Sequence, residues 1–511
     1  MMNKVINRSM KSAVSITLML FSIVTYGQGG KLQKVFNKKE LNTLYNAVLI
    51  HPDSLSIHNN YLDAMGIDNP KLLKEYDALL TKFPKSAVVP YAYGIYLSRL
   101  ESPEARKYLL VAVERDSTLS EAFSALAFDA QRRGDMNLSL EYLLSAKRAA
   151  PNDPNHAFYY ASTWKNFDSN RWILESLNVA KNFPDHQRGA QALFWLAERS
   201  MNFQDKRNFY RLLRESYPAD QFSWSAAGSR EEIEYLLTID PSEALRLALE
   251  MAAKPKLAKE FGEYLNVAKL VADASMSMSE NRPDAAIESY EQIKDLPAFS
   301  KFKKQLPVLI AKAISKAGQP DKAYNSLLVK VKVSPNTELL NGIISLGKDL
   351  NKSEDQILRD INDQLFKNAE LATDFTLKRY DGLPESSLKD FRGKVVLLTY
   401  WFPGCGPCRG EFPHFEKVYR KYKDQDVAYL AINIVSNQNP FVLPFLKETG
   451  YSFTPLEDVD GRNKGNLDNK NRAPINFLID KTGKIIFSDF RIDGHNEDEL
   501  ETMFDLLLKR S

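Results

Sequence analysis

Two patterns of apolar residues divide the chain. From about residue 37 to residue 366, apolar positions recur at helical spacing, and prolines and short polar segments separate the stretches. After residue 375, short continuous apolar runs appear at 395–402 and 427–434, which is typical of buried strands. We therefore expect several domains, an all-α helical region followed by an α/β domain, with the boundary near residues 368–374.

The helical region repeats itself. Tyr108-Leu-Leu-Val-Ala112 recurs 34 residues later as Tyr142-Leu-Leu-Ser-Ala146, and residues 176–180 follow after another 34. Each copy follows an aromatic-rich helix and precedes a turn, and related segments return at residues 283–290 and 320–327. A helix-turn-helix unit of this length resembles the tetratricopeptide repeat in a divergent form. Stacked pairs share a core and form a groove, so we expect a solenoid over residues 28–367 that binds protein partners.

The only two cysteines of the 511 residues stand three positions apart, at Cys405 and Cys408. The apolar run 395–402 precedes them, and Phe412 and Phe415 follow at helical spacing. This order predicts a buried strand, a tight turn and a helix whose first turn carries Cys-Gly-Pro-Cys. Unpaired backbone N–H groups there favour a thiolate, so we expect Cys405 to be the nucleophile. Cys408, one turn further on, could then resolve a mixed disulfide.

Cys405-Gly-Pro-Cys408-Arg-x-Glu-x-Pro after a Val/Leu strand resembles the TlpA-like thiol-disulfide oxidoreductases of the thioredoxin fold. The resemblance covers residues 368–511. It implies a redox-active disulfide that exchanges with protein thiols and disulfides. The Gly-Pro between the cysteines is that of thioredoxin, whose potential is roughly −270 mV, which predicts a reductase. Its electrons would come from a membrane partner.

The same resemblance assigns roles to two residues away from the cysteines. Pro474 matches the cis-proline that faces the redox turn; the alternative is an ordinary trans proline at a strand start. Glu411 matches a glutamate that the family keeps after the second cysteine, and it could relay the proton of Cys408; the alternative is a solvated carboxylate. The acid that thioredoxin carries on the preceding strand is replaced by Thr399.

The chain departs from the family just before the first cysteine. The family usually has tryptophan there, and this chain has Gly404. Trp401 and Phe402 are candidates to cover the site instead, and Ala473 is a third candidate for contact with a substrate. His414 follows Glu411 by one helical turn and could approach the site, although a place on the helix surface is the commoner outcome for such a histidine.

The first residues are typical of a secretory signal. A basic start is followed by an apolar stretch at residues 13–24 and by small and polar residues near Gly27. We therefore expect a cleaved signal peptide at residues 1–27 and a periplasmic protein. The alternative is an uncleaved membrane anchor, for which the apolar stretch is short. Export predicts an oxidising compartment. There, a chain with only these two cysteines, three positions apart, suggests a redox-active disulfide rather than a structural one.

Composition excludes other classes of function. The net charge is +3, from 68 basic and 65 acidic residues, which provides no argument for a nucleic-acid partner. Two cysteines and six scattered histidines argue against a zinc site, and no cofactor motif appears. Two hypotheses remain open: a protein-disulfide reductase whose repeats bind partners, and a repeat-based scaffold or chaperone whose redox domain is secondary.

Overall fold

The computed structural model describes residues 36–509 with gaps at 67–68, 295, 297–299 and 332–336. The predicted signal peptide, residues 1–27, lies outside the described residues. Phe36–Ser511 form the compact unit that is considered below. Within the described part of the chain, every helix is too short or too polar to cross a membrane.

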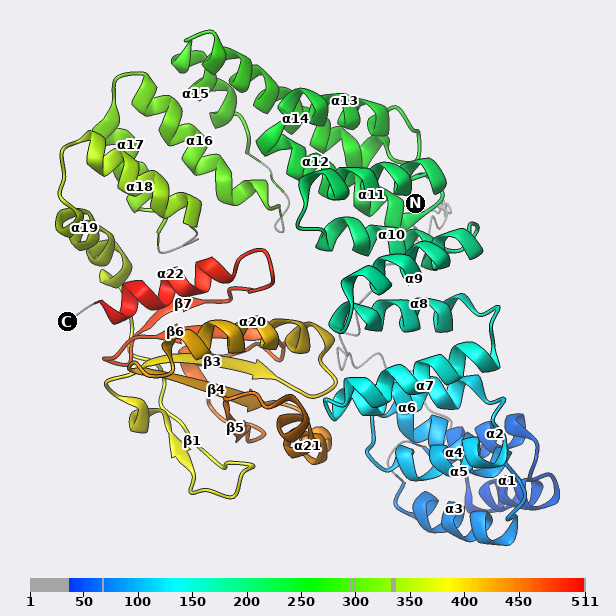
Figure 1. Ribbon diagram of the computed structural model, residues 1–511. Coiled ribbons are helices and arrows are strands. Elements are labelled where there is room, and N and C mark those ends of the chain that lie inside the picture. Colours follow the sequence, from blue (N-terminus) through cyan, green and yellow to red (C-terminus); the bar gives the residue numbers. More distant parts are fainter. Residues whose placement is uncertain (1–35, 67–68, 295, 297–299, 332–336, 510–511) are drawn as a thin grey trace, which may run out of the picture. The chain divides into compact units, whose positions relative to one another are not determined.

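The amino-terminal region of this unit is all helical, as the spacing of apolar residues predicted (Figure 1). Its helices are α1 (Lys38–Ile50), α2 (Leu55–Met65), α3 (Lys71–Lys82), α4 (Val88–Arg99), α5 (Ala105–Arg115), α6 (Ser120–Arg132), α7 (Met136–Ala149), α8 (Pro154–Thr163), α9 (Ser169–Asn182), α10 (Gln187–Arg199), α11 (Phe203–Ser216), α12 (Ser223–Ile239), α13 (Pro241–Ala252), α14 (Ala258–Ser279), α15 (Pro283–Glu291), α16 (Phe302–Lys316), α17 (Pro320–Leu328), α18 (Thr337–Asp349) and α19 (Glu354–Phe366).

Consecutive helices pack in pairs, α4 with α5, α6 with α7 and α8 with α9. The repeated segment lies on the second helix of each pair, where Tyr108, Ala112 and Ala146 are fully buried. The repeat is therefore a packing motif that joins neighbouring pairs. Local signals set the helix starts: Asp135 and Asp153 accept hydrogen bonds from free N–H groups at the starts of α7 and α8.

The carboxy-terminal region is built on a five-stranded sheet of order β5-β4-β3-β6-β7. The strands are β3 (Val395–Trp401), β4 (Val427–Asn433), β5 (Thr454–Glu457), β6 (Ile475–Ile479) and β7 (Ile485–Ser488). Strand β3 lies at the centre, parallel to β4 and antiparallel to β6. A two-stranded hairpin of β1 (Thr376–Leu377) and β2 (Ser386–Ser387) precedes the sheet.

Successive side chains of β3 alternate between two hydrophobic cores, one on each face of the sheet. Leu397 and Trp401 pack in the core that includes side chains of α20 (Gly406–Tyr422), α21 (Asn439–Thr449) and α22 (Glu497–Leu508). Leu398 and Tyr400 pack on the opposite face, against the segment that carries β1 and β2. All seven residues of β3 are buried, which explains why this strand is a continuous apolar run in the sequence.

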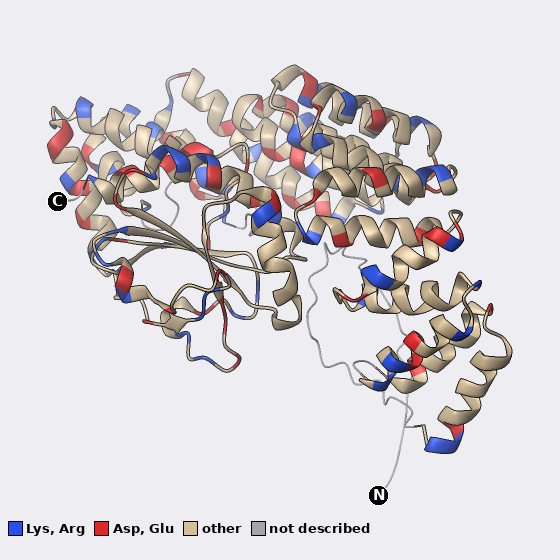
Figure 2. Cartoon of the chain, turned by 60° about the horizontal axis from the view of Figure 1, so that its bottom comes forward, with Lys and Arg blue, Asp and Glu red and all other residues tan. Residues whose placement is uncertain are grey.

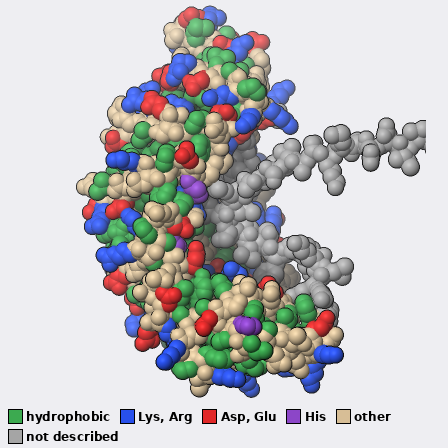
Figure 3. Space-filling model, turned by 90° about the vertical axis from the view of Figure 1, so that its right-hand side faces the viewer, with side chains coloured by type: hydrophobic (Ala, Val, Ile, Leu, Met, Phe, Trp, Pro, Cys, Tyr) green, Lys and Arg blue, Asp and Glu red, His purple; other side chains and the backbone are tan. Residues whose placement is uncertain are grey.

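Charged residues of both signs are interspersed along the helices of both regions (Figure 2). The face in Figure 3 shows the same mixture, with hydrophobic side chains scattered between the charges. This distribution accompanies the small net charge of the chain.

Candidate redox site

The two cysteines lie where β3 turns into α20. The Cys405 N–H donates to the Phe402 carbonyl oxygen (2.9 Å), which closes the turn. Cys405 is the N-cap of α20, and its sulfur accepts the Cys408 N–H at 3.2 Å. A disulfide joins the two residues, whose Cα atoms are 5.3 Å apart. After reduction, the same N–H and the helix N-terminus can stabilise a thiolate on Cys405.

Glu411 lies one helical turn beyond Cys408, and its side chain is 6% exposed. Burial raises the pKa of this carboxyl to about 7. Arg491 and the hydrogen bonds from Asn476 and Ile492 limit the rise, because each favours the charged form. The carboxyl oxygens accept from Asn476 Nδ2 (3.2 Å) and from the Ile492 N–H (3.1 Å). A carboxyl that titrates near neutral pH can take up and return a proton.

Asn476 is the functional neighbour that sequence reasoning missed. It lies on β6, is fully buried, and also donates to the Phe490 carbonyl oxygen (2.8 Å). Its partner across the ladder is Thr399 of β3, at the position where thioredoxin has an acid. The available signal was its chemistry, because it is the polar residue within the otherwise apolar strand Ile475–Ile479. A buried amide in such a strand needs a partner, and here Glu411 is one.

The Ala473–Pro474 peptide bond is cis. Pro474 directly precedes β6, and Ile475 pairs with Tyr400 near the end of β3 that leads to the redox turn. Ala473 is half-buried and packs against the core that contains both cysteines. The strand order therefore brings the proline segment and the redox turn to the same end of the sheet.

Trp401 and His414 were both considered as residues near the redox site. In the structure, their side chains contact other parts of the protein. Trp401 is fully buried, and its ring packs against Phe412 and Phe445 with centroids 5.0 and 5.1 Å away. Its ring therefore packs α20 and α21 against β3 and is not exposed to a substrate, whereas Phe402 is partly exposed. His414 Nδ1 is 2.6 Å from Glu497 Oε1, so this histidine links α20 to α22.

Gly404 is approached by a residue of the helical region. Its N–H donates to Gln438 Oε1 (2.6 Å), and Gln438 Nε2 donates to the Glu101 carboxylate. A Cβ on Gly404 would lie 2.7 Å from Glu101 Oε2, so a side chain there would require the Glu101 side chain to shift. Arg132 holds the other Glu101 oxygen at 3.2 Å. The departure from the family's tryptophan thus coincides with a contact from the loop after α4.

Charged residues of both the helical region and the redox region lie next to the Cys-Gly-Pro-Cys turn. Arg409, next to Cys408, is partly buried, and its Nη1 has no hydrogen-bond partner among the described residues. Burial and the nearby Arg132 lower its pKa to about 10, and Glu101 opposes both effects. Glu101 adopts φ +54°, a left-handed conformation that costs energy outside glycine. Two cations, Arg409 and Arg132, and one carboxylate, Glu101, therefore lie close together next to the turn that carries the cysteines.

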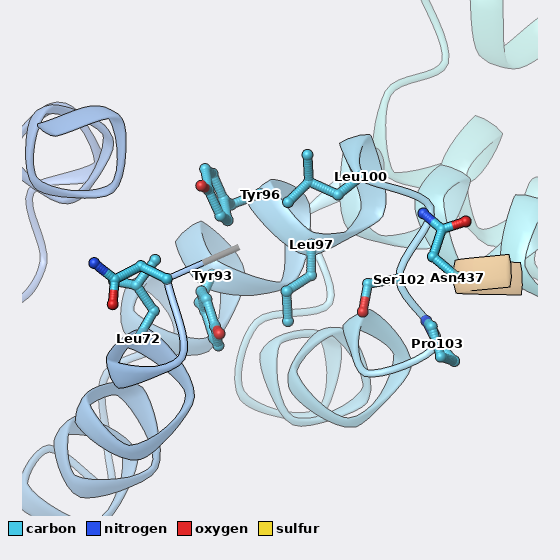
Figure 4. A pocket seen from close by; sticks show the side chains of 9 residues that line it. Leu72, Tyr93, Tyr96, Leu97, Leu100, Ser102, Pro103 and Asn437 are labelled. Carbon is cyan, nitrogen blue, oxygen red and sulfur yellow. The ribbon is translucent and has the colours of Figure 1, made fainter. Parts of the chain in front are cut away.

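A cavity of about 130 Å³ lies beside this contact (Figure 4). Asn437, the neighbour of Gln438, lines it from the redox region. The remaining lining comes from α3, α4 and the loops before α3 and after α4, and it combines apolar and aromatic side chains with polar ones: Asn69, Leu72, Tyr93, Tyr96, Leu97, Leu100, Ser102 and Pro103.

Residues 367–504 match the redoxin family. Among known proteins, the thioredoxin-like protein YneN of Bacillus subtilis is 34% identical over 137 residues, which are 26% of this chain and 77% of YneN. The thiol-disulfide oxidoreductase ResA of Geobacillus kaustophilus is 37% identical over 22% of this chain and 64% of ResA, less than two thirds of its length. A crystal structure of a thiol:disulfide interchange protein of the thioredoxin family from Chlorobium tepidum is 20% identical, with a TM-score of 0.23, over 28% of this chain and 97% of that one.

Proposed function

Because the chain belongs to the redoxin family of thiol-disulfide oxidoreductases, we propose that it reduces disulfides of other proteins through Cys405 and Cys408. One observation carries the proposal. The only cysteines of the chain form a disulfide at the first turn of α20, with a buried carboxyl of raised pKa one turn behind them. A disulfide with a purely structural role would not need a buried carboxyl of raised pKa beside it.

In the reduced protein, the Cys405 thiolate attacks one sulfur of a substrate disulfide, and the other sulfur leaves as a thiolate that takes a proton from solvent. Cys408 then passes its proton to Glu411 and attacks Cys405 Sγ. The first substrate sulfur leaves and takes that proton. The substrate gains two electrons and two protons, and the Cys405–Cys408 disulfide forms. An external thiol donor must reduce it again.

Substrate binding is proposed at the end of the sheet where these groups meet. The backbone of Ala473, ahead of the cis-Pro474 bond, can pair with an extended substrate segment, and Phe402, which is partly exposed, is a further candidate contact just before the cysteines. The described side chain of Trp401 is buried, so it is left out of this proposal.

The helical repeats are proposed to hold protein partners next to the redox turn. The Glu101 contact and the cavity between Tyr96, Leu100 and Asn437 support this, because both lie where the repeats meet the turn before α21. The competing proposal is a scaffold whose redox domain is secondary, which the extent of the repeat region favours.

Export and the source of electrons are proposed from the sequence pattern. The signal-like residues 1–27 support a periplasmic location, and the Gly-Pro between the cysteines supports the reductase direction. In an oxidising compartment the pair needs a steady supply of electrons, for which we propose a membrane thiol donor.

Insulin reduction tests the enzymatic proposal. With a small-molecule dithiol as donor, the wild-type protein should accelerate insulin precipitation, and Cys405→Ser should abolish the acceleration. Cys408→Ala should accumulate mixed disulfides on Cys405, because the resolving thiol is absent. An inert wild-type protein would support the scaffold proposal. An active protein from which Cys408→Ala traps no protein in cells would contradict protein clients.

A further inference from the structure

A histidine and two carboxylates converge between α6 and α8, away from the cysteines. Glu121 lies at the start of α6, Asp153 is the N-cap of α8, and His156 lies in the first turn of α8. One ligand atom from each of the three lies within 4.8 Å of the other two. His156 is 2% exposed, whereas the Glu121 side chain is largely in solvent. The group therefore has a fixed, buried imidazole and an exposed carboxylate above it.

One ring nitrogen of His156 has a hydrogen-bond partner, and the other has none among the described residues. His156 Nδ1 is hydrogen-bonded to Ser124 Oγ at 2.9 Å, and Ser124 is itself buried. His156 Nε2 is buried and has no hydrogen-bond partner among the described residues. It points toward Asp153 Oδ2 at 3.9 Å and Glu121 Oε1 at 4.0 Å, too far for hydrogen bonds. A buried polar nitrogen without a partner is costly, so this arrangement suggests a missing ligand.

We propose that His156 Nε2, Asp153 and Glu121 bind a divalent transition-metal ion, for which Zn²⁺ is the probe. One imidazole nitrogen and two carboxylate oxygens suit zinc and its neighbours, whereas magnesium and calcium prefer oxygen ligands alone. Ser124 supplies the outer contact on Nδ1 that fixes the ring. Three protein ligands leave a fourth position for water or for a group of a partner.

Small movements complete this site. Bond lengths near 2.0–2.1 Å place neighbouring ligand atoms of a tetrahedral zinc about 3.4 Å apart, so the separations of 3.9 and 4.0 Å must shorten by about 0.5 Å. Rotation of the exposed Glu121 side chain can shorten its separation from His156, and the separation of His156 from Asp153 needs a small shift of the Asp153 carboxylate. Asp153 keeps its role at the helix start, because its Oδ1 accepts the Asn155 N–H (2.7 Å) while Oδ2 faces the histidine. The ion would tie α6 to α8.

The test is isothermal titration of Zn²⁺ into the untagged full-length protein, kept oxidised so that Cys405 and Cys408 are held in their disulfide and do not compete. The site variants are Glu121→Gln and Asp153→Asn; asparagine is as good an N-cap as aspartate. The matched controls are Glu114→Gln, an exposed carboxylate of α5, and Asp135→Asn, the N-cap of α7.

We expect one Zn²⁺ per wild-type chain, a loss of affinity of about 10-fold or more in each site variant, and little change in the controls. Ser124→Ala should weaken binding about 10-fold as well. Zn²⁺ should raise the thermal midpoint of the wild type and not of Glu121→Gln, because an ion that binds only the folded state stabilises it. The absence of saturable binding, or equal binding by wild type and site variants, would overturn the proposal.

Discussion

Glu411→Gln tests whether the buried carboxyl moves the proton of Cys408. Glutamine has nearly the same shape, and its amide oxygen can accept from both Ile492 N–H and Asn476 Nδ2, which are 3.1 and 3.3 Å from Glu411 Oε1. The variant keeps the two hydrogen bonds to this oxygen, loses the Asn476 contact to Oε2, and can no longer bind a proton.

The size of the effect follows from the pKa of about 7. At this pKa the wild-type carboxyl is poised to accept the Cys408 proton near neutral pH, and a positioned general base contributes about 10²–10⁴-fold. We expect resolution of the mixed disulfide to slow at least about 100-fold in Glu411→Gln. The inflection near pH 7 in the pH dependence of the resolution rate should also disappear in this variant. Attack by Cys405 should be unchanged, because the helix N-terminus stabilises that thiolate without help from Glu411.

Rapid mixing of the reduced protein with a dye-labelled peptide disulfide separates the two steps, since the first peptide leaves on attack and the second on resolution. Glu416→Gln is the matched control. Glu416 is also buried on α20, but its oxygens accept from the N–H and Oγ of Ser452. Resolution at the wild-type rate by Glu411→Gln, or an inflection near pH 7 that persists, would refute the proton relay.

The same carboxyl makes stability depend on pH. Its pKa rises from 4.5 to about 7 on folding, so the folded state binds the proton more tightly. Stability should fall as pH increases from about 4.5 to about 7, by at most about 3 kcal/mol, and change little through this group outside that window. Urea denaturation of the oxidised protein should show a smaller fall in Glu411→Gln. Parallel pH dependence in both proteins would contradict the assigned pKa.

Three further substitutions probe the surroundings of the site. Asn476→Ala removes a donor that favours charged Glu411, so the inflection of the resolution rate should move above pH 7, by about one unit; an unmoved inflection would count against the contact. Gly404→Trp places a side chain where Glu101 lies, so proteolysis in the loop at residues 100–104 should accelerate, and Glu101→Ala should reverse this by making room. Trp401→Ala should lower the unfolding free energy by about 3–5 kcal/mol in urea denaturation, because the ring is fully buried; a loss below about 1 kcal/mol would contradict its packing role.

Much of the fold could be predicted from the sequence. Apolar residues at helical spacing predicted the helices, and the continuous runs at 395–402 and 427–434 predicted β3 and β4. The turn with Cys405 and Cys408 and the strand after Pro474 were also anticipated. These features depend on residues close together in the sequence, whose preferences act before any tertiary contact forms.

Contacts between distant segments needed the tertiary structure. The Glu411–Asn476 pair joins α20 to β6, and the approach of Glu101 to Gly404 depends on how a loop of the repeats packs. Scattered histidines argued against a metal site, yet helix packing brings His156 close to Glu121, which lies on another helix. Sequence alone was enough to predict the main elements and the place of Cys405 and Cys408 at the start of α20. Packing decided the partners of buried polar groups, because their pairing depends on distances that local periodicity does not encode.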